Sequence, residues 1–218
     1  MNKVRFVASY SGGKDSVLAI AAAMELGLEP ACLLTTYDPE AERSFFHGIP
    51  EEMLREAAKA MALPLRLVPT SGAQYERNFE RALDQCRQQG MEAVVFGDID
   101  IQEHRRWCSQ RCERTGLQAV FPLWNQPRRE LAHRFIDRGF QAVITTVNTD
   151  LLPPHFLGRT LTRALVQEIV DCGADGCGEN GEYHTFAFDG PIFHQPVPYQ
   201  LGDVVTRPPY QMLPIAAR

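Results

Sequence analysis

The sequence predicts an α/β protein in which helices cover a mostly parallel sheet. Short β-branched runs alternate with segments of helical periodicity from residue 4 to residue 170, the pattern of repeated strand–helix–strand units. A length of 218 residues suits one such core with a minor appendage. Glycine, proline and aromatic residues replace the helical periodicity after residue 170. We therefore expect a core over residues 1–170 and a substrate-pocket segment over 171–218 that folds back across it.

The first elements follow from local signals. Residues 4–9 form an apolar run typical of a strand, and residues 15–26 read as a helix that Gly27 ends. Because this helix is apolar almost all round, we expect it to be deeply buried. A second strand is expected at 31–36, followed by a polar loop over 37–48 that is long enough to suggest a function. Pro50 and two acidic residues then open another helix.

The alternation continues along the rest of the core. Further strands are expected at residues 65–68, 93–96, 119–121 and 142–147, and further helices at 75–86, 102–115, 128–137 and 160–170. The apolar positions of 75–86 recur at helical spacing, and Pro127 precedes the helix at 128.

Composition limits the classes of partner and the compartment. The chain has 22 basic and 27 acidic residues, and its net charge of −5 argues against general nucleic-acid binding. Its basic pairs, Arg105-Arg106 and Arg128-Arg129, are expected to be solvated. No apolar run predicts a membrane helix or a signal peptide. The six cysteines lack the C-x₂-C spacing of metal sites, so we expect reduced thiols, no metal-binding cysteines and a cytoplasmic protein.

A glycine-rich loop follows the first expected strand and precedes the first helix. It comprises Ser11, Gly12, Gly13, Lys14, Asp15 and Ser16. Two glycines let backbone N–H groups approach a ligand, and the helix start adds unpaired donors and partial positive charge. The spacing is neither a Walker A loop nor a dinucleotide fingerprint. An anion cradle of phosphate size is the functional interpretation, and a capped glycine turn is the structural one.

A second polar run lies in the C-terminal segment. Residues 178–185 contain Glu179, Asn180, Glu182, Tyr183, His184 and Thr185, and an alternating apolar run follows to residue 193. Such a density of polar groups beside a strand suggests side chains presented to a small molecule. A solvated glycine turn is the structural alternative.

Both runs carry a family resemblance. Residues 11–16 resemble the SGGxDS signature of the PP-loop ATP pyrophosphatases, and residues 178–185 resemble the GENGEFHT motif of their diphthine–ammonia ligase subgroup. Three shorter runs, at 97–99, 122–124 and 189–193, are also similar to this subgroup. The resemblance implies a five-stranded, Rossmann-like parallel sheet of the HUP type. It also implies ATP with Mg²⁺ and the release of pyrophosphate.

The resemblance further implies roles for single residues. Ser11, Gly12, Gly13, Asp15 and Ser16 would contact the phosphates, while Lys14 stands at the variable position of the signature. The 179–185 residues would form the acceptor pocket, with His184 or Glu182 as the candidate base for the incoming amine. Four further candidates for nucleotide or substrate contact lie at strand ends: Thr35, Thr36, Gly97 and Asp98. His47, in the long loop, is the last candidate. Their structural alternatives are plain strand ends and a helix-capping aspartate.

The implied reaction is carboxylate activation. A substrate carboxylate, small or protein-borne, would attack the α-phosphorus of ATP, and ammonia would then displace AMP to leave an amide. Glu103 and His104 stand where these ligases would carry a Tyr-Gln pair, so diphthine or a related carboxylate stays open as the acceptor. An RNA-thiolating PP-loop enzyme and a non-catalytic nucleotide-binding protein are the alternatives. The oligomeric state also stays open, with a homodimer as one option.

Overall fold

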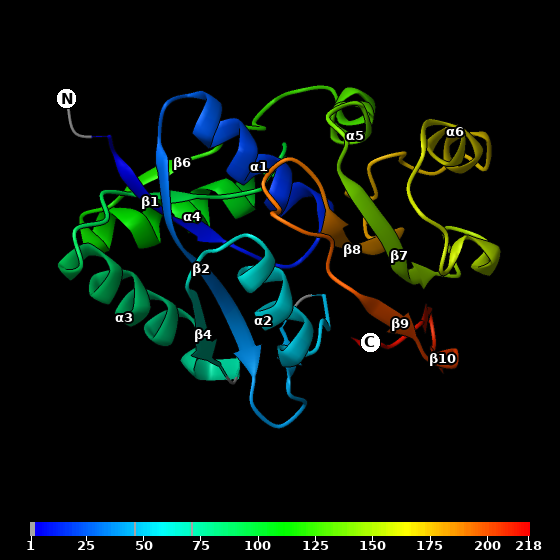
Figure 1. Cartoon of the computed structure of the whole chain (residues 1–218), viewed down its shortest axis with the longest axis horizontal. Coiled ribbons are helices and arrows are strands. Elements are labelled where there is room, and N and C mark those ends of the chain that lie inside the picture. Colours follow the sequence, from blue (N-terminus) through cyan, green and yellow to red (C-terminus); the bar gives the residue numbers. More distant parts are fainter. Residues whose placement is uncertain (1–2, 46, 71) are drawn as a thin grey trace.

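The computed structural model describes residues 3–45, 47–70 and 72–218, so that residue 46 of the expected 37–48 loop lies outside it. Its main sheet has five parallel strands in the order β4-β2-β1-β5-β6 (Figure 1). Their bounds are β1 Arg5–Ser9, β2 Glu29–Asp38, β4 Leu65–Pro69, β5 Ala93–Val95 and β6 Gln118–Val120. A two-residue strand, β3 (Arg43–Ser44), pairs antiparallel with the end of β2. The predicted five-stranded parallel sheet is confirmed.

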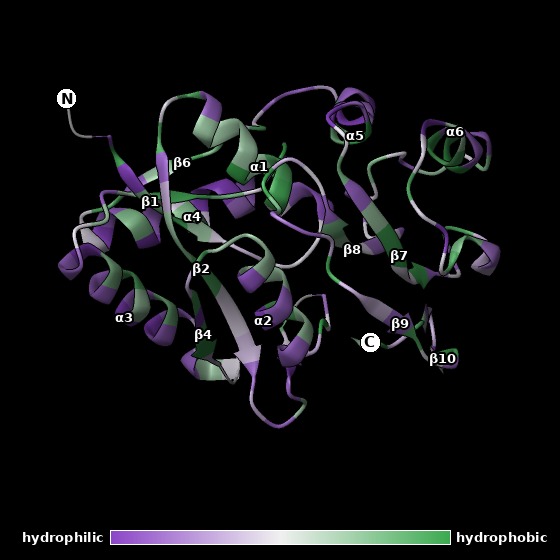
Figure 2. Ribbon diagram, viewed as in Figure 1, coloured by the Kyte–Doolittle hydropathy of each residue, from purple (hydrophilic) through white to green (hydrophobic). Residues whose placement is uncertain are grey.

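Helices cover both faces of this sheet. They are α1 Lys14–Glu25, α2 Glu51–Ala60, α3 Tyr75–Gln88 and α4 Gln102–Thr115. Helices α5 Arg128–Asp137 and α6 Arg163–Asp171 contact each other instead, and η1 Gly72–Gln74 and η2 Pro154–Phe156 are short 3-10 turns. Buried residues of α1 and α2 belong to one apolar cluster, and those of α3 and α4 belong to a second cluster on the other face. Apolar and polar stripes alternate around α3 (Figure 2). The predicted arrangement, a parallel sheet with helices on both faces, is therefore confirmed.

A second, antiparallel sheet lies beside the first. Its strand order is β10-β11-β7-β8, with β7 at Gln141–Asn148, β8 at Tyr183–Asp189, β10 at Val205–Arg207 and β11 at Tyr210–Met212. Strands β9 (Tyr199–Leu201) and β12 (Ile215–Ala217) form a separate pair. The expected C-terminal β segment is thus present. The division between 1–170 and 171–218 stays a prediction, because the second sheet takes strands from both sides of it.

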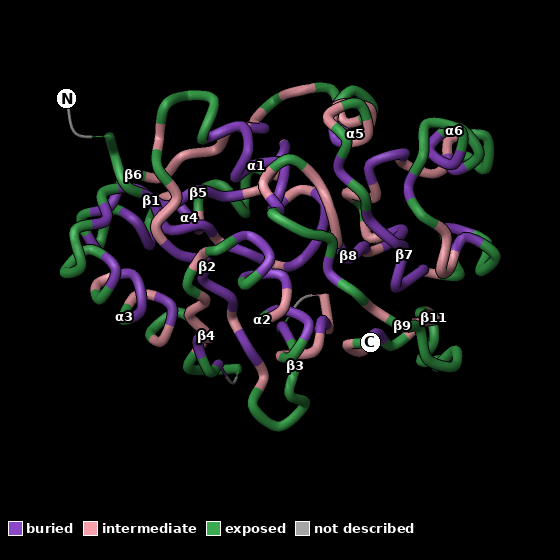
Figure 3. The backbone as a smooth tube through the Cα atoms, viewed as in Figure 1, coloured by how far each residue is buried: buried purple, intermediate pink, exposed green. Residues whose placement is uncertain are grey.

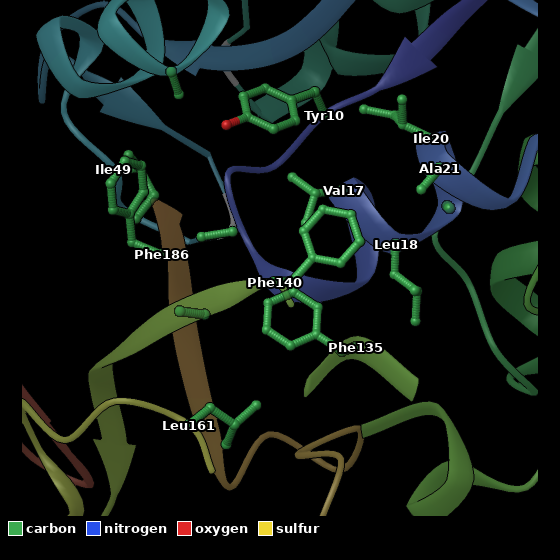
Figure 4. Close-up of a cluster of buried hydrophobic side chains, with 14 of the residues drawn as sticks. Tyr10, Val17, Leu18, Ile20, Ala21, Ile49, Phe135, Phe140, Leu161 and Phe186 are labelled. Carbon is green, nitrogen blue, oxygen red and sulfur yellow. The ribbon is translucent and has the colours of Figure 1, made fainter. Parts of the chain in front are cut away.

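Helix α1 lies between the two sheets and is the centre of the core. Nine of its twelve residues are buried, as the all-round apolar pattern predicts (Figure 3). Val17 and Leu18 of α1 lie near Phe140 and Phe135, whose rings stack with centroids 5.2 Å apart (Figure 4). A helix enclosed on both sides cannot shift without disturbing two sheets, so its first turn is a rigid platform.

In the part of the chain that the structure describes, no helix combines the length and the apolar character needed to cross a membrane.

Gly190, directly after β8, tests the packing of the second sheet. Its φ is +149°, and a Cβ built there would fall on the Phe140 ring. Gly190→Ala should therefore lower the free energy of unfolding by about 1–3 kcal/mol through overpacking. Gly139→Ala is the control, because its φ is +81° but nothing lies within 4 Å of the new Cβ. Urea midpoints for the two variants measure the difference, and equal midpoints would contradict the packing.

Candidate active site

The glycine loop and the 178–185 segment line one cavity of about 570 Å³. The cavity opens where β1 and β5 end, which is the edge at which open parallel sheets bind ligands. Eleven of the predicted site residues line it: Ser11, Lys14, Asp15, Ser16, His47, Gly97, Asp98, Glu179, Tyr183, His184 and Thr185. Its volume suits a nucleotide-sized molecule. Two motifs that lie more than 160 residues apart in the chain therefore form one site.

The glycine loop is held by its own hydroxyl groups. The Gly13 N–H donates to Ser11 Oγ at 3.3 Å, and Ser16 Oγ donates to the Gly13 carbonyl at 2.8 Å. Gly12 has a φ of +87°, a conformation that favours glycine. Gly13 is the N-cap of α1 and supplies no side-chain cap. The first-turn N–H groups of α1 thus begin without a partner from their own loop.

Close packing explains two of the glycines. A Cβ on Gly13 would lie 2.8 Å from His47 Cε1, so the imidazole ring occupies the space of the missing side chain. A Cβ on Gly97 would lie 3.1 Å from the carbonyl carbon and oxygen of Asp15. The end of β5 therefore touches the start of α1 directly, and Gly97 sets the width of the cavity floor.

Strand β8 supplies the cap that the loop lacks. The Lys14 N–H donates to Thr185 Oγ1 at 3.1 Å, and the Ala187 N–H donates to the Gly12 carbonyl at 2.9 Å. These two hydrogen bonds attach the second sheet to the glycine loop. Only the first of the helix-start N–H groups is used in this way, and Asp15 and Ser16 beside it line the cavity, where an anion can accept hydrogen bonds from a helix start.

A buried ion pair sits inside the loop. Lys14 Nζ lies 2.7 Å from Asp15 Oδ2, and the Lys14 side chain is 6% exposed. Burial lowers the pKa of Lys14, but the surrounding groups, Asp15 first among them, together outweigh burial and hold that pKa well above its usual value. Cys177 donates from Sγ to Asp15 Oδ1 at 3.8 Å, and burial raises the pKa of this thiol to about 12. Lys14 therefore stays a cation and Cys177 a neutral donor, so Asp15 is held from both sides.

Two further carboxyl groups face the same cavity. Burial raises the pKa of Glu179 to about 7, with additional repulsion from Asp15. Burial also raises the pKa of Asp98, although His104 opposes this with Nδ1 3.5 Å from Asp98 Oδ1. Burial and the negative charge of Asp15 both disfavour the ionised carboxylates, so a cation bound beside them would stabilise their charged forms.

Two imidazole rings stand beside the loop. The centroids of His47 and His184 are 4.6 Å apart. Burial, together with His184 and Lys14, lowers the pKa of His47 to about 3, against a weaker opposing contribution from the Thr185 backbone. Burial and Lys14 also lower the pKa of His184. Both rings are therefore neutral at physiological pH, and a neutral ring can accept a proton.

Six predicted residues do not line the cavity. They are Gly12, Gly13, Thr35, Thr36, Asn180 and Glu182. Thr35 Oγ1 donates to the Tyr10 carbonyl at 2.6 Å, so this hydroxyl stabilises the strand ends. Glu182 is buried and accepts from the Asp175 N–H and from the backbone and side chain of Asn180, each at 3.0 Å. The contacts of Glu182 serve the turn, and His184 is the candidate base that reaches the cavity.

An aromatic wall completes the cavity and was not anticipated from the sequence. It consists of Tyr75 and Phe79 of α3, Phe96 after β5, and Trp107 of α4. The ring centroids of Tyr75 and Trp107 are 5.6 Å apart, and those of Phe79 and Trp107 are 5.3 Å apart. Tyr75 and Phe79 lie on the apolar face that predicted the helix. Helical spacing alone does not tell a core face from a cavity face.

Arg128 joins the two halves of the chain. Its Nε and Nη2 donate to the two carboxylate oxygens of Asp100, each at 2.7 Å. Its Nη1 donates to Asp175 Oδ2 and to Asn180 Oδ1, each at 2.8 Å. The expectation that this arginine is solvated was wrong, because one planar guanidinium matches carboxylate partners on both sides. The arrangement fixes the 175–182 turn at the cavity mouth.

The cysteines are free thiols, and the described residues contain no group of three or more side chains suited to hold a metal ion. Cys108 and Cys112 lie on α4, and burial raises the pKa of each thiol. The absence of a metal role for the cysteines stays a prediction.

The raised pKa of Glu179 predicts a pH effect on stability. The folded protein holds this proton up to a pH of about 7, whereas the unfolded chain releases it near the usual value. Stability should therefore fall as the pH rises from about 4.5 to about 7, because the folded state binds more protons across that window. Glu179→Gln should remove this part of the slope. Thermal unfolding of both proteins without ligand measures it, and parallel pH profiles would contradict the burial.

Arg128 predicts a local loss of order. Arg128→Met should speed amide hydrogen exchange across residues 175–182 and lower the free energy of unfolding by about 1.5–3 kcal/mol, since hydrogen bonds to charged groups are lost. Arg129→Met is the matched control, because Arg129 contacts only the exposed Gln167 side chain among the described residues. Equal exchange in the two variants would show that Arg128 does not hold the turn.

The comparisons with known proteins agree with this architecture. Residues 4–119 match the diphthamide synthase N-terminal domain, and residues 127–200 match the diphthamide synthase C-terminal domain. A Homo sapiens relative named diphthine–ammonia ligase is 28% identical over 239 residues, covering 98% of this chain and 89% of the relative. A Bos taurus relative of the same name has the same identity and coverage.

Among solved structures, a Methanocaldococcus jannaschii protein described as a predicted subunit of tRNA methyltransferase aligns with a TM-score of 0.46 and 15% identity. The alignment covers 84% of this chain and 96% of that one. This likeness is too weak to carry an argument. The two matched domains together extend over most of the sequence and contain the glycine loop and the 178–185 segment respectively. The chain therefore belongs to the diphthamide synthase family.

Proposed function

We propose that this protein is an ATP-dependent amide ligase. It adenylates a substrate carboxylate, releases pyrophosphate and joins the activated acyl group to ammonia with loss of AMP. The observation that carries the proposal is the shared cavity, in which a helix-start anion cradle faces the polar 178–185 segment. Family membership and the ligase name of both mammalian relatives support it.

The cavity divides into parts that suit the parts of ATP. The glycine loop presents N–H groups, the Ser11 hydroxyl and the Lys14 ammonium, which suit the β- and γ-phosphates. Tyr75, Phe79 and Trp107 form an apolar aromatic surface that suits a purine ring. Thr36 Oγ1 lies 3.5 Å from Tyr75 Oη, so the end of β2 adjoins this surface and keeps its proposed place beside the base or ribose.

The residues act mainly by position and charge. As the substrate carboxylate attacks the α-phosphorus, the glycine loop stabilises the negative charge that builds on the departing pyrophosphate. Ammonia then attacks the acyl carbon, the bond to AMP breaks, and the nitrogen loses a proton. His184 is neutral and faces the cavity, so it is our candidate to accept that proton.

Mg²⁺ is proposed together with ATP. Asp15, Asp98 and Glu179 line the cavity but do not form a three-ligand metal cluster. Mg²⁺ commonly binds through one or two carboxylates plus substrate phosphates, so this donor set fits it. When bound, the ion would neutralise charge on the phosphates.

The acceptor is proposed from the relatives' names. Diphthine, or a related small or protein-borne carboxylate, would enter beside residues 178–185. His104 stands at the position that departs from the ligase pattern, and it lines the cavity and contacts Asp98. We therefore propose that His104 and Asp98 influence which acceptor binds. A cytoplasmic location and a homodimer stay predictions.

Asp15→Ala tests the proposal. Pyrophosphate release from ATP, measured with diphthine-bearing protein and ammonium, should fall at least about a hundredfold, because Lys14 loses its partner and the loop loses its preorganised charge. Asp84→Ala, on α3 and outside the cavity, is the matched control and should keep the full rate.

Two outcomes separate the alternatives. A wild-type protein that binds ATP but releases no pyrophosphate with any carboxylate would be a nucleotide-binding protein. Full pyrophosphate release by Asp15→Ala would remove the glycine loop from the reaction.

A further inference from the structure

A second, smaller pocket lies behind the imidazole pair. Its volume is about 160 Å³, and it shares the His47 wall with the main cavity. The lining comes from Arg43 and residues 47–49, from β7 and from the β10–β11 hairpin with the residues that follow it: Arg43, His47, Gly48, Ile49, Thr145, Thr146, Val205, Arg207, Met212, Leu213, Pro214 and Ile215. Nothing in the proposed placement of ATP uses this space.

The pocket is cationic and has no internal counter-charge. Arg43 and Arg207 line it, and no acidic residue is among the described residues of the lining. Arg43 donates from Nε to the Ala41 carbonyl at 3.0 Å. Neither guanidinium forms an ion pair with another described residue. In a chain of net charge −5, two arginines without an acidic partner in one small pocket form an unusual positive site.

Buried hydroxyl groups form the floor. Thr145 and Thr146 of β7 line the pocket, and Thr146 is 8% exposed. A threonine hydroxyl can donate a hydrogen bond to an anion held in the pocket. Thr145 donates from Oγ1 to the His184 carbonyl at 3.4 Å. The floor is thereby connected to the strand that carries the candidate base.

We propose that this pocket binds a carboxylate of the acceptor, separate from the carboxylate that is activated. A guanidinium presents paired N–H donors that match a carboxylate, and Thr146 adds a hydroxyl donor. The pocket and the main cavity touch at His47, so an acceptor anchored here reaches toward the glycine loop. The assignment to the acceptor rests on the proposed ligase function, whereas the binding of the anion does not.

Arginine modification tests the site on the intact wild-type protein. Phenylglyoxal labels accessible arginines, and mass spectrometry reads each position. Succinate should slow the labelling of Arg43 and Arg207 relative to Arg87 and Arg106, which are exposed, carry no ion pair among the described residues and lie outside the pocket. Phosphate, added in a parallel sample, distinguishes a carboxylate site from a general oxyanion site.

Single variants supply the second measurement. In each of the variants Arg43→Gln and Arg207→Gln, one pocket arginine remains, and its half-maximal protection should need about tenfold more succinate. About tenfold is the usual effect of losing a hydrogen bond to a charged group. Arg106→Gln should leave that concentration unchanged. All positions are exposed, so the variants should keep the unfolding midpoint of the wild type.

Each result bears on the proposal. Selective protection by succinate supports it, whereas equal labelling of all four arginines overturns it, and protection by phosphate alone overturns the carboxylate assignment. Pyrophosphate release in the same preparation is read separately. If the protein releases pyrophosphate but succinate does not protect the two pocket arginines, only the anion site is ruled out. If succinate protects the arginines but no pyrophosphate is released, the ligase proposal is ruled out and the anion site remains.

Discussion

The hydrogen bond from the Lys14 N–H to Thr185 Oγ1 is the contact on which the site depends. Helix α1 starts at a glycine that cannot cap it, and the missing acceptor comes from a strand 171 residues later in the chain. Together with the bond from Ala187 to Gly12, it ties the anion cradle to the polar segment that faces it. Because α1 is buried between the two sheets, the geometry of the cradle and of its opposite wall is set together.

Electrostatics within the cavity favour an anion and a cation bound together. The helix start and Lys14 attract phosphate, but Asp15, Asp98 and Glu179 surround them with acidic groups. A bare anion would meet repulsion from these carboxyl groups, and burial, with a smaller contribution from Asp15, already raises the pKa values of Glu179 and Asp98. A phosphate chain would interact with the helix start and Lys14, and its bound metal ion would interact with the three carboxyl groups. This is the charge pattern of a nucleotide–metal complex.

The sequence predicted what is local and missed what depends on distant partners. The strands of the parallel sheet and the glycine loop follow from alternating segments and from glycine placement, because those signals lie within a few residues, whereas the count of five strands came from the family resemblance. Strand β7 looked like one more strand of the series, but its partners are β8 and β11, which no local pattern reveals. Thr35 and Glu182 were predicted from the family resemblance, and only the fold shows that their side-chain oxygens are used internally. Tyr75 and Phe79 were hidden for the opposite reason, since a core-facing and a cavity-facing helix share one periodicity.

The attachment of β8 also limits how the enzyme can protect its intermediate. An acyl-adenylate must be kept from water until the amine arrives, and many enzymes close a mobile segment for this purpose. Here the 183–189 strand is hydrogen-bonded to the glycine loop, and the 175–182 turn is held by Arg128 through Asp175 and Asn180. Neither element can open without breaking charged or buried hydrogen bonds. We therefore infer that the acceptor bound beside residues 178–185 itself excludes water from the cavity. In such an enzyme the fit of the acceptor controls hydrolysis as well as affinity, so a second anchoring site behind His47 would serve both.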